Sequence, residues 1–167
     1  MLKKPVRLHD VFVLLGSNLG DSINQLGRAQ RLIELMCGRI MSTSSIYRTA
    51  AWGNRDQPDF YNQVIGIKTA LAPDILMNKC LAIEAQMGRK RQGNWTPRII
   101  DIDLLLYDEK TITEKNVTIP HPRLHLRKFT LIPLAEIAPD HVHPIYGMTI
   151  TELLKVCSDQ SEVEIIG

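Results

Sequence analysis

The sequence of 167 residues is poor in three features that often reveal a specialised class of protein. Aromatic residues make up only 5%, the three cysteines are scattered without metal or redox spacing, and no apolar run approaches the ~20 residues that cross a bilayer. The formal charge is only +2, too small for a large nucleic-acid footprint. We therefore expect one soluble cytoplasmic domain over residues 1–167, with reduced thiols and no membrane partner.

A Walker-type phosphate loop is absent as well, because no glycine-spaced segment ends in Gly-Lys-Ser or Gly-Lys-Thr. The most informative stretch is an apolar run, Ile99–Tyr107, which predicts a buried strand and is interrupted by Asp101 and Asp103. Residues two apart share one face of a strand, so the two carboxylates start about 6.5 Å apart. Unpaired carboxylates are costly to bury there, and this spacing can hold one or two Mg²⁺ ions.

Four cations precede this strand in the glycine-containing stretch 88–98, namely Arg89, Lys90, Arg91 and Arg98. A basic loop that runs directly into an acidic strand indicates a site for polyphosphate together with a metal ion. The simpler alternative is that the aspartates line the solvated face of a half-exposed strand. An Asp-x-Asp pair by itself does not exclude that alternative.

Hydrophobic periodicity predicts the order strand, helix, strand, strand, helix, strand. The strands are expected at 9–15, 40–47, 60–71 and 99–107, and the helices at 22–37 and 73–87. Ser22, followed three residues later by Gln25, predicts a capping box on the first helix. Beyond 107 we expect a turn with one short edge strand within 108–119, short helices at 129–137 and 149–156, and a weakly patterned end. This order is typical of an α+β, ferredoxin-like βαββαβ core, in which helices pack on an antiparallel sheet.

Six ordered segments together resemble one enzyme family over nearly the whole chain. They are residues 15–21, 44–49, 56–62, 97–105, 119–124, and Phe129 with 133–139. Along them the chain is similar to the 6-hydroxymethyl-7,8-dihydropterin pyrophosphokinases of the folate pathway. The resemblance implies a ferredoxin-like fold and transfer of a pyrophosphoryl group from ATP to the hydroxymethyl group of the dihydropterin, with release of AMP.

The resemblance also implies how the charged residues act on ATP. Asp101 and Asp103 match carboxylates that hold two Mg²⁺ ions between the phosphates and the attacking hydroxyl, where positioned cations suit the developing charge. Arg89 and Arg91 match a mobile catalytic loop that closes over the triphosphate. The other nucleotide-side matches are two closing residues, Trp95 and Arg98, two phosphate or nucleotide contacts, His121 and Arg127, and a residue near the ATP ribose, Glu84.

For the pterin, the resemblance implies an aromatic pair, Phe60 and Phe129, that stacks on both faces of the ring. Asn62 matches the amide that reads the polar edge of the ring, with Thr49 and the backbone near Trp52 beside it. A flat polar heterocycle gains from such stacking and is discriminated by directional donors and acceptors.

The sequence departs from the family pattern at several places. The run Asn94–Pro97 stands where many members have Arg-Trp-Gly-Pro. The loop between Arg91 and Trp95 is one residue shorter than in well-known members of the family. Asn116 occupies a place that is basic in some relatives, and Ala50 one that is often proline. These departures concern loop dynamics and ATP affinity rather than the reaction class.

Two other functions stay open. A ferredoxin-like nucleic-acid-binding module would place the basic loop on phosphates and Phe60 or Trp95 on bases. The low aromatic content and the buried acid pair, which would repel a phosphate backbone without metal, disfavour it. A Mg²⁺-dependent nucleotidyltransferase would release pyrophosphate instead of AMP. We expect a monomer that binds ATP and hydroxymethyldihydropterin as small-molecule substrates and binds no nucleic acid.

Overall fold

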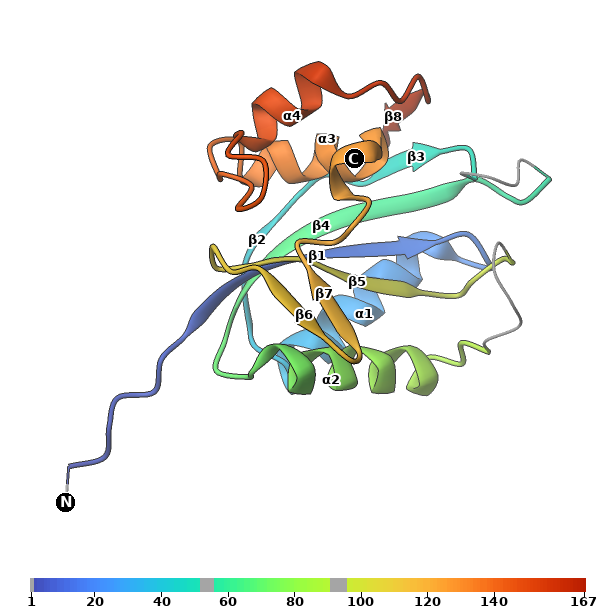
Figure 1. Cartoon of the computed structure of the whole chain (residues 1–167). Helices are drawn as coiled ribbons and strands as arrows, with labels where there is room; N and C mark the ends of the chain where they lie inside the picture. Colours follow the sequence, from blue (N-terminus) through green and yellow to red (C-terminus); the bar gives the residue numbers. More distant parts are fainter. Residues whose placement is uncertain (1, 52–55, 91–95) are drawn as a thin grey trace.

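The structure is a computed structural model that describes residues 2–51, 56–90 and 96–167. Its centre is a six-stranded antiparallel sheet (Figure 1). The strands of this sheet are β1 (His9–Ser17), β2 (Arg39–Thr43), β3 (Tyr47–Thr49), β4 (Phe60–Thr69), β5 (Asp101–Tyr107) and β8 (Val163–Ile165). Their order is β5-β1-β4-β3-β8, and β2 also pairs with β4.

Helices cover both faces of the sheet (Figure 1). One face carries α1 (Ser22–Met36) and α2 (Pro73–Gln86), and the other carries α3 (Lys128–Ile137) and α4 (Ile150–Val156). Because side chains alternate along a strand, β1 serves both layers: Leu15 belongs to the core with α1 and α2, and Leu14 to the core with α3 and α4. The predicted α+β class is confirmed, and the elements from β1 to β5 follow the predicted order except that two strands, β2 and β3, replace the single strand predicted at 40–47.

The first helix is capped by Asp21 rather than by the predicted Ser22. The Asp21 carboxylate accepts a hydrogen bond from the backbone N–H of Asn24 at 3.2 Å. Ser22 is already helical, and its hydroxyl accepts from the Ser17 hydroxyl at 3.1 Å. The capping-box prediction was therefore wrong by one residue, since Asp caps as well as Ser does and its charge also suits the helix dipole.

The strand predicted at 40–47 is two strands, because side chains take part in the pairing at Ser44 and Ser45. The Ser44 hydroxyl accepts from a backbone N–H of β4 at 2.9 Å, and Glu136 accepts from both the N–H and the hydroxyl of Ser45. The Tyr47 hydroxyl also donates to Glu136, so that α3 is joined to the beginning of β3. This break leaves β3 as a short strand of its own.

Residues 108–119 form a hairpin rather than a single edge strand. Its strands, β6 (Ile112–Glu114) and β7 (Val117–Ile119), make a separate two-stranded sheet, and a 3-10 turn, η1 (Leu124–Leu126), follows. The two later helices lie within one residue of their predicted bounds. β8, in the weakly patterned end, was not predicted. In the part of the chain that the structure describes, every helix is too short or too polar to cross a membrane.

Candidate active site

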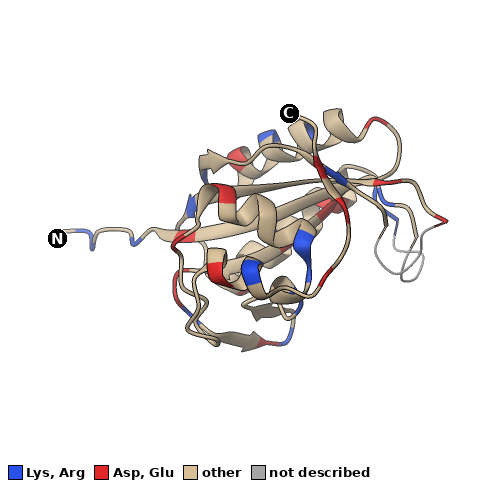
Figure 2. Cartoon of the chain, turned by 90° about the horizontal axis from the view of Figure 1, so that it is seen from above, with Lys and Arg blue, Asp and Glu red and all other residues tan. Residues whose placement is uncertain are grey.

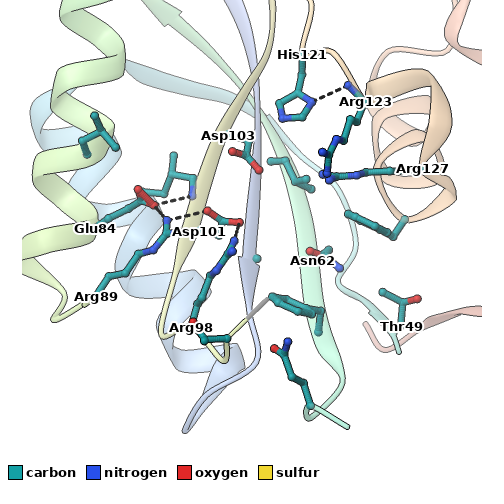
Figure 3. A pocket seen from close by; sticks show the side chains of 18 of the residues that line it. Thr49, Asn62, Glu84, Arg89, Arg98, Asp101, Asp103, His121, Arg123 and Arg127 are labelled. Atoms are coloured by element: carbon teal, nitrogen blue, oxygen red, sulfur yellow. Dashed lines mark hydrogen bonds and ion pairs between the residues drawn. The ribbon is translucent and has the colours of Figure 1, made fainter. Parts of the chain in front are cut away.

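A cavity of about 420 Å³ lies at one edge of the sheet (Figure 3). The antiparallel pairing brings the ends of β1 and β3 beside the beginnings of β4 and β5: Gly16 pairs with both Asn62 and Asp101. Most of the predicted site residues line it: Thr49, Phe60, Asn62, Glu84, Arg89, Arg98, Asp101, Asp103, His121, Arg127 and Phe129. The other three, Trp52, Arg91 and Trp95, lie outside the described residues.

The two aspartates at the beginning of β5 both line this cavity (Figure 3). Burial, reinforced by the negative charge of Asp101, raises the pKa of Asp103 to about 8. A nearby cation stabilises the ionised form of a carboxylate whose pKa is raised by burial in this way. The strand prediction therefore placed the acid pair correctly, inside a cavity rather than on a solvated face.

Two arginines donate hydrogen bonds to the Asp101 carboxylate. Arg89 donates to Oδ1 and Arg98 to Oδ2, each at 2.8 Å. The Arg89 guanidinium also pairs with Glu84, a buried carboxylate on α2 whose pKa is raised mainly by burial. Glu84 thus holds Arg89 against the wall of the cavity, next to the acid pair.

The acid pair fits a hard divalent cation that is shared with a phosphate ligand. Among residues 2–51, 56–90 and 96–167, no three His, Cys, Asp or Glu side chains gather as a complete metal site. Mg²⁺, however, is commonly held by one or two carboxylates and takes its remaining ligands from water and phosphate oxygens. Asp101 and Asp103 are such a pair, and the two guanidinium groups on Asp101 show that this carboxylate attracts cations.

His121, Arg123 and Arg127 form a basic wall on the other side of the acid pair (Figure 3). The His121 Nδ1 accepts the backbone N–H of Arg123 at 3.1 Å, so the proton of the neutral ring lies on Nε2. Burial, together with the charge of Arg127, lowers the pKa of His121 to about 4 and keeps the ring neutral at pH 7. The wall thus offers an anion one neutral donor and two permanent cations.

The other end of the cavity is aromatic and polar, and contains Phe60, Phe129, Asn62 and Thr49. Asn62 is 3% exposed and Thr49 is 4% exposed. Among the described residues, neither Asn62 Nδ2 nor Thr49 Oγ1 has a hydrogen-bond partner. A buried polar group without a partner costs roughly 1–3 kcal/mol, so these atoms indicate a ligand with a polar edge. Gly16 makes room for the amide, since a Cβ there would lie 2.8 Å from Asn62 Oδ1.

Some residues that line the cavity were not predicted. Met77 and Leu81 lie on α2 at the helical spacing that leads to Glu84, so the three form one stripe along the helix. That spacing was the signal that could have found them. Arg123 lies inside the matched segment 119–124 and was signalled only by its charge.

The amino-acid sequence matches one family of enzymes. The model of the 7,8-dihydro-6-hydroxymethylpterin-pyrophosphokinase (HPPK) family matches residues 12–139. The 2-amino-4-hydroxy-6-hydroxymethyldihydropteridine pyrophosphokinase of Methylorubrum extorquens is 43% identical over 141 residues, which are 84% of this chain and 88% of that protein. The protein of the same name from Haemophilus influenzae is 39% identical over 155 residues, which are 92% of this chain and 96% of that protein.

Solved structures agree with this fold. A crystal structure of an HPPK-DHPS chain in complex with substrates has a TM-score of 0.75 at 16% identity, over 89% of this chain and 43% of that one. Wild-type HPPK-DHPS of Plasmodium falciparum has a TM-score of 0.73 at 19% identity, over 90% of this chain and 42% of that one. The chain therefore spans less than half the length of these two solved chains, and at this identity the likeness concerns the fold alone.

Proposed function

The chain belongs to the 7,8-dihydro-6-hydroxymethylpterin-pyrophosphokinase family, and on that premise we propose that it transfers a pyrophosphoryl group from ATP to 6-hydroxymethyl-7,8-dihydropterin in folate biosynthesis. The substrate hydroxyl attacks the β-phosphorus of ATP and loses its proton. The bond from that phosphorus to the α–β bridging oxygen breaks, so that AMP leaves and the pterin diphosphate forms. One observation carries this proposal: a single cavity holds an acid pair among arginines at one end and, beside two phenylalanines at the other, an amide nitrogen, Asn62 Nδ2, that has no hydrogen-bond partner among the described residues.

At the acidic end, Asp101 and Asp103 would hold two Mg²⁺ ions. Bound Mg²⁺ would draw charge from the phosphate oxygens and lower the barrier to phosphoryl transfer. Arg98 and Arg127 would pair with the triphosphate, and the Nε2–H of neutral His121 would donate to a phosphate oxygen. These groups lie on both sides of the acid pair, which suits a chain of phosphates that crosses it.

The nucleotide also requires Arg89 to change partners. We infer that Arg89 would exchange Asp101 for the triphosphate if that carboxylate held Mg²⁺, and that Glu84 would lie near the ribose. Arg91 and Trp95, which lie outside the described residues, would close over ATP with it, as the resemblance implies. Closure of this kind would keep water from the activated phosphate.

At the opposite end, the pterin ring would stack between Phe60 and Phe129. Asn62 Nδ2 and Thr49 Oγ1 would bond to the polar edge of the ring, beside the backbone near Trp52, which lies outside the described residues. This binding satisfies two buried groups that have no partner among the described residues. It also directs the hydroxymethyl group of the substrate toward the acid pair.

The test is to incubate the protein with ATP, Mg²⁺ and 6-hydroxymethyl-7,8-dihydropterin and to resolve the nucleotide products. We expect AMP and pterin diphosphate in equal amounts, and no AMP without the pterin. The control substrate is 6-methyl-7,8-dihydropterin, which lacks the attacking hydroxyl and should compete without reacting. Formation of ADP would instead indicate simple phosphoryl transfer, and release of pyrophosphate a nucleotidyltransferase; either result contradicts the proposal.

A further inference from the structure

Residues 157–167, which we call the strap, join the two walls of the proposed pterin pocket. One wall includes Thr49, the last residue of β3, and the other includes Phe129, in the first turn of α3. The strap follows α4 and runs past the beginning of α3 to β3 (Figure 1). It lies beyond residues 12–139, which are the part of the chain that the family model matches.

The first attachment of the strap is to β3. Val163 of β8 pairs with Thr49, and Glu164 pairs with Arg48, in an antiparallel ladder. The side chains of Arg48 and Glu164 also form an ion pair. The other edge of β3 pairs with β4. The strap therefore completes the hydrogen-bond ladder on the outer edge of β3, up to the residue that lines the pocket.

The second attachment is to α3. Asp159 Oδ2 accepts the backbone N–H of Lys128, the first residue of α3, at 2.9 Å. The preceding residue, Arg127, has no side-chain acceptor that could cap the helix, so the strap supplies one. Asp159 is held by the N–H and hydroxyl of Ser161, at 2.9 and 2.6 Å. Burial opposes its charge, yet these hydrogen bonds and that from Lys128 lower the pKa of Asp159 overall, and a carboxylate suits a helix N-terminus.

The two attachments are close together along the chain. The four residue-to-residue steps from Asp159 to Val163 can span at most roughly 14 Å, so we expect a movement of one wall to be transmitted to the other. A hollow of about 940 Å³ lies between the strap and β3, and it shares Thr49 and Ala50 with the active-site cavity. Among the described residues this hollow borders the end of β3, so the hydrogen-bond ladders to the strap and to β4 both contribute to its positioning.

We propose that the strap is a positioning element for pterin binding, which fixes the separation of Thr49 and Phe129 and so the width of the pocket. This inference rests on the proposed function, which assigns these two residues to the pterin. Of the described residues that line the active-site cavity, none belongs to the strap. Its residues therefore act through β3 and α3 and not by touching the substrate.

The first experiment compares three single variants by their KM values for the pterin and for ATP and by their Tm. Asp159→Ala removes the attachment to α3, Asp159→Asn keeps an oxygen that can accept from Lys128, and Glu164→Gln removes only an exposed ion pair. We expect Asp159→Ala to raise the pterin KM about fivefold, the effect of roughly one lost helix cap, and to leave the ATP KM within about twofold. Asp159→Asn should restore most of the pterin affinity, and Glu164→Gln should match the wild type.

The second experiment removes β8 by ending the chain after Ser161 and measures hydrogen exchange at residues 47–49 and 128–131. We expect faster exchange at 47–49 and a raised pterin KM. The strap is not a positioning element if Asp159→Ala and the truncated chain both keep the wild-type pterin KM. It is also not one if the KM for the pterin and the KM for ATP rise together as Tm falls. If the wild type transfers no pyrophosphoryl group, the proposed function fails instead. In that case, unchanged hydrogen exchange at residues 47–49 and 128–131 in the variants would separately contradict the positioning role of the strap.

Discussion

At the scale of single residues, the Asp101 carboxylate is already paired with positive charge, because each of its two oxygens accepts a hydrogen bond from an arginine. Arg89 and Arg98 each donate to it at 2.8 Å. A metal ion that uses Asp101 must displace at least part of this pairing. We therefore expect the arginines to compete with metal when no phosphate is present, and to pair with the phosphates of bound ATP.

This competition predicts that Arg98→Ala strengthens metal binding to the nucleotide-free protein. A charge-assisted hydrogen bond at this half-buried position is worth roughly 1 kcal/mol, so the Kd for Mn²⁺ should fall about fivefold. Titration followed by electron paramagnetic resonance measures it. The control is Arg48→Ala. It removes a guanidinium that is paired with Glu164 on β8 and does not line the active-site cavity. An Arg98→Ala variant that binds Mn²⁺ no better than the wild type would show that the arginine does not compete.

Gly16 provides a second prediction, which concerns the pterin end of the site. A methyl group at this position would lie 2.8 Å from Asn62 Oδ1 and must push the amide out of place. We expect Gly16→Ala to raise the pterin KM about tenfold, the effect of roughly one lost hydrogen bond to a buried group, and to leave the ATP KM unchanged. Gly27→Ala on α1 is the matched control, because its nearest neighbour lies at 3.6 Å. If both variants bind the pterin equally well, Asn62 does not read its edge.

The residues of the site were easier to predict than their contacts. Asp101, Asn62 and Phe129 stand inside segments whose order along the chain is distinctive, and the structure places all three in one cavity; their roles stay predictions. The pairing of Asp101 with Arg98, and the lack of a partner for Thr49 Oγ1 among the residues that the structure describes, depend on distances between separate elements. Such distances are set by packing, and residue spacing within one segment does not encode them.

At the scale of elements, strands that are apolar on both faces were predictable and strands that depend on neighbours were not. β1 and β5 carry apolar runs, and their predicted positions overlap the observed ones. β2 and β3 are separated at Ser45, whose partner is Glu136 on a distant helix. β8 has three residues and exists as a strand through its pairing with β3. Short strands of this kind gain most of their stability from tertiary partners.

The loop that precedes α4 is attached to η1 through His143, which is 1% exposed. Its Nδ1 accepts the backbone N–H groups of Ile145 and Tyr146 at 3.2 and 3.3 Å. Its ring also lies against Tyr146, and edge-on to His125 of η1, with centroids 4.7 and 6.3 Å away. Burial, together with the nearby imidazoles of His125 and His141, lowers the pKa of His143 to about 4.

This environment predicts that the folded state weakens in mild acid. The pKa of His143 is lower in the folded chain than in the unfolded chain, so stability is lost as pH falls from about 6.5 toward 4. Between pH 7.5 and 5, urea unfolding should show the wild type losing roughly 1–2 kcal/mol more than His143→Asn. Asn keeps an acceptor near the position of Nδ1 but does not titrate, and His121 titrates in both proteins. Equal losses would mean that His143 does not control this pH response.

At the scale of the whole molecule, the distribution of charge bears on the alternative function, a nucleic-acid-binding module. Figure 2 shows Lys and Arg interspersed with Asp and Glu along the chain, in keeping with a net charge of +2. A protein that tracks a nucleic-acid backbone needs a continuous basic groove. The basic residues that line the cavity face two aspartates instead.

We therefore expect single-stranded RNA to bind no better than roughly 10⁻⁴ to 10⁻⁶ M at physiological salt, the range of non-specific electrostatic binding. Filter binding with and without Mg²⁺ measures it. A matched titration with ATP and Mg²⁺ checks that the preparation is active. Tight, salt-sensitive RNA binding that needs no Mg²⁺ would favour a nucleic-acid-binding module over the enzyme.

We propose that Asp101 and Asp103 form the centre of a site that moves the two terminal phosphoryl groups of ATP together. The most direct measurement supplies ATP labelled at the β-phosphorus and follows the label into the pterin, in the wild type and in Asp101→Asn and Asp103→Asn. We predict labelled pterin diphosphate and unlabelled AMP from the wild type, and a loss of about 10³-fold in both variants with circular dichroism unchanged. Transfer at near wild-type rates by either variant, or label that stays on the nucleotide, would contradict the claim.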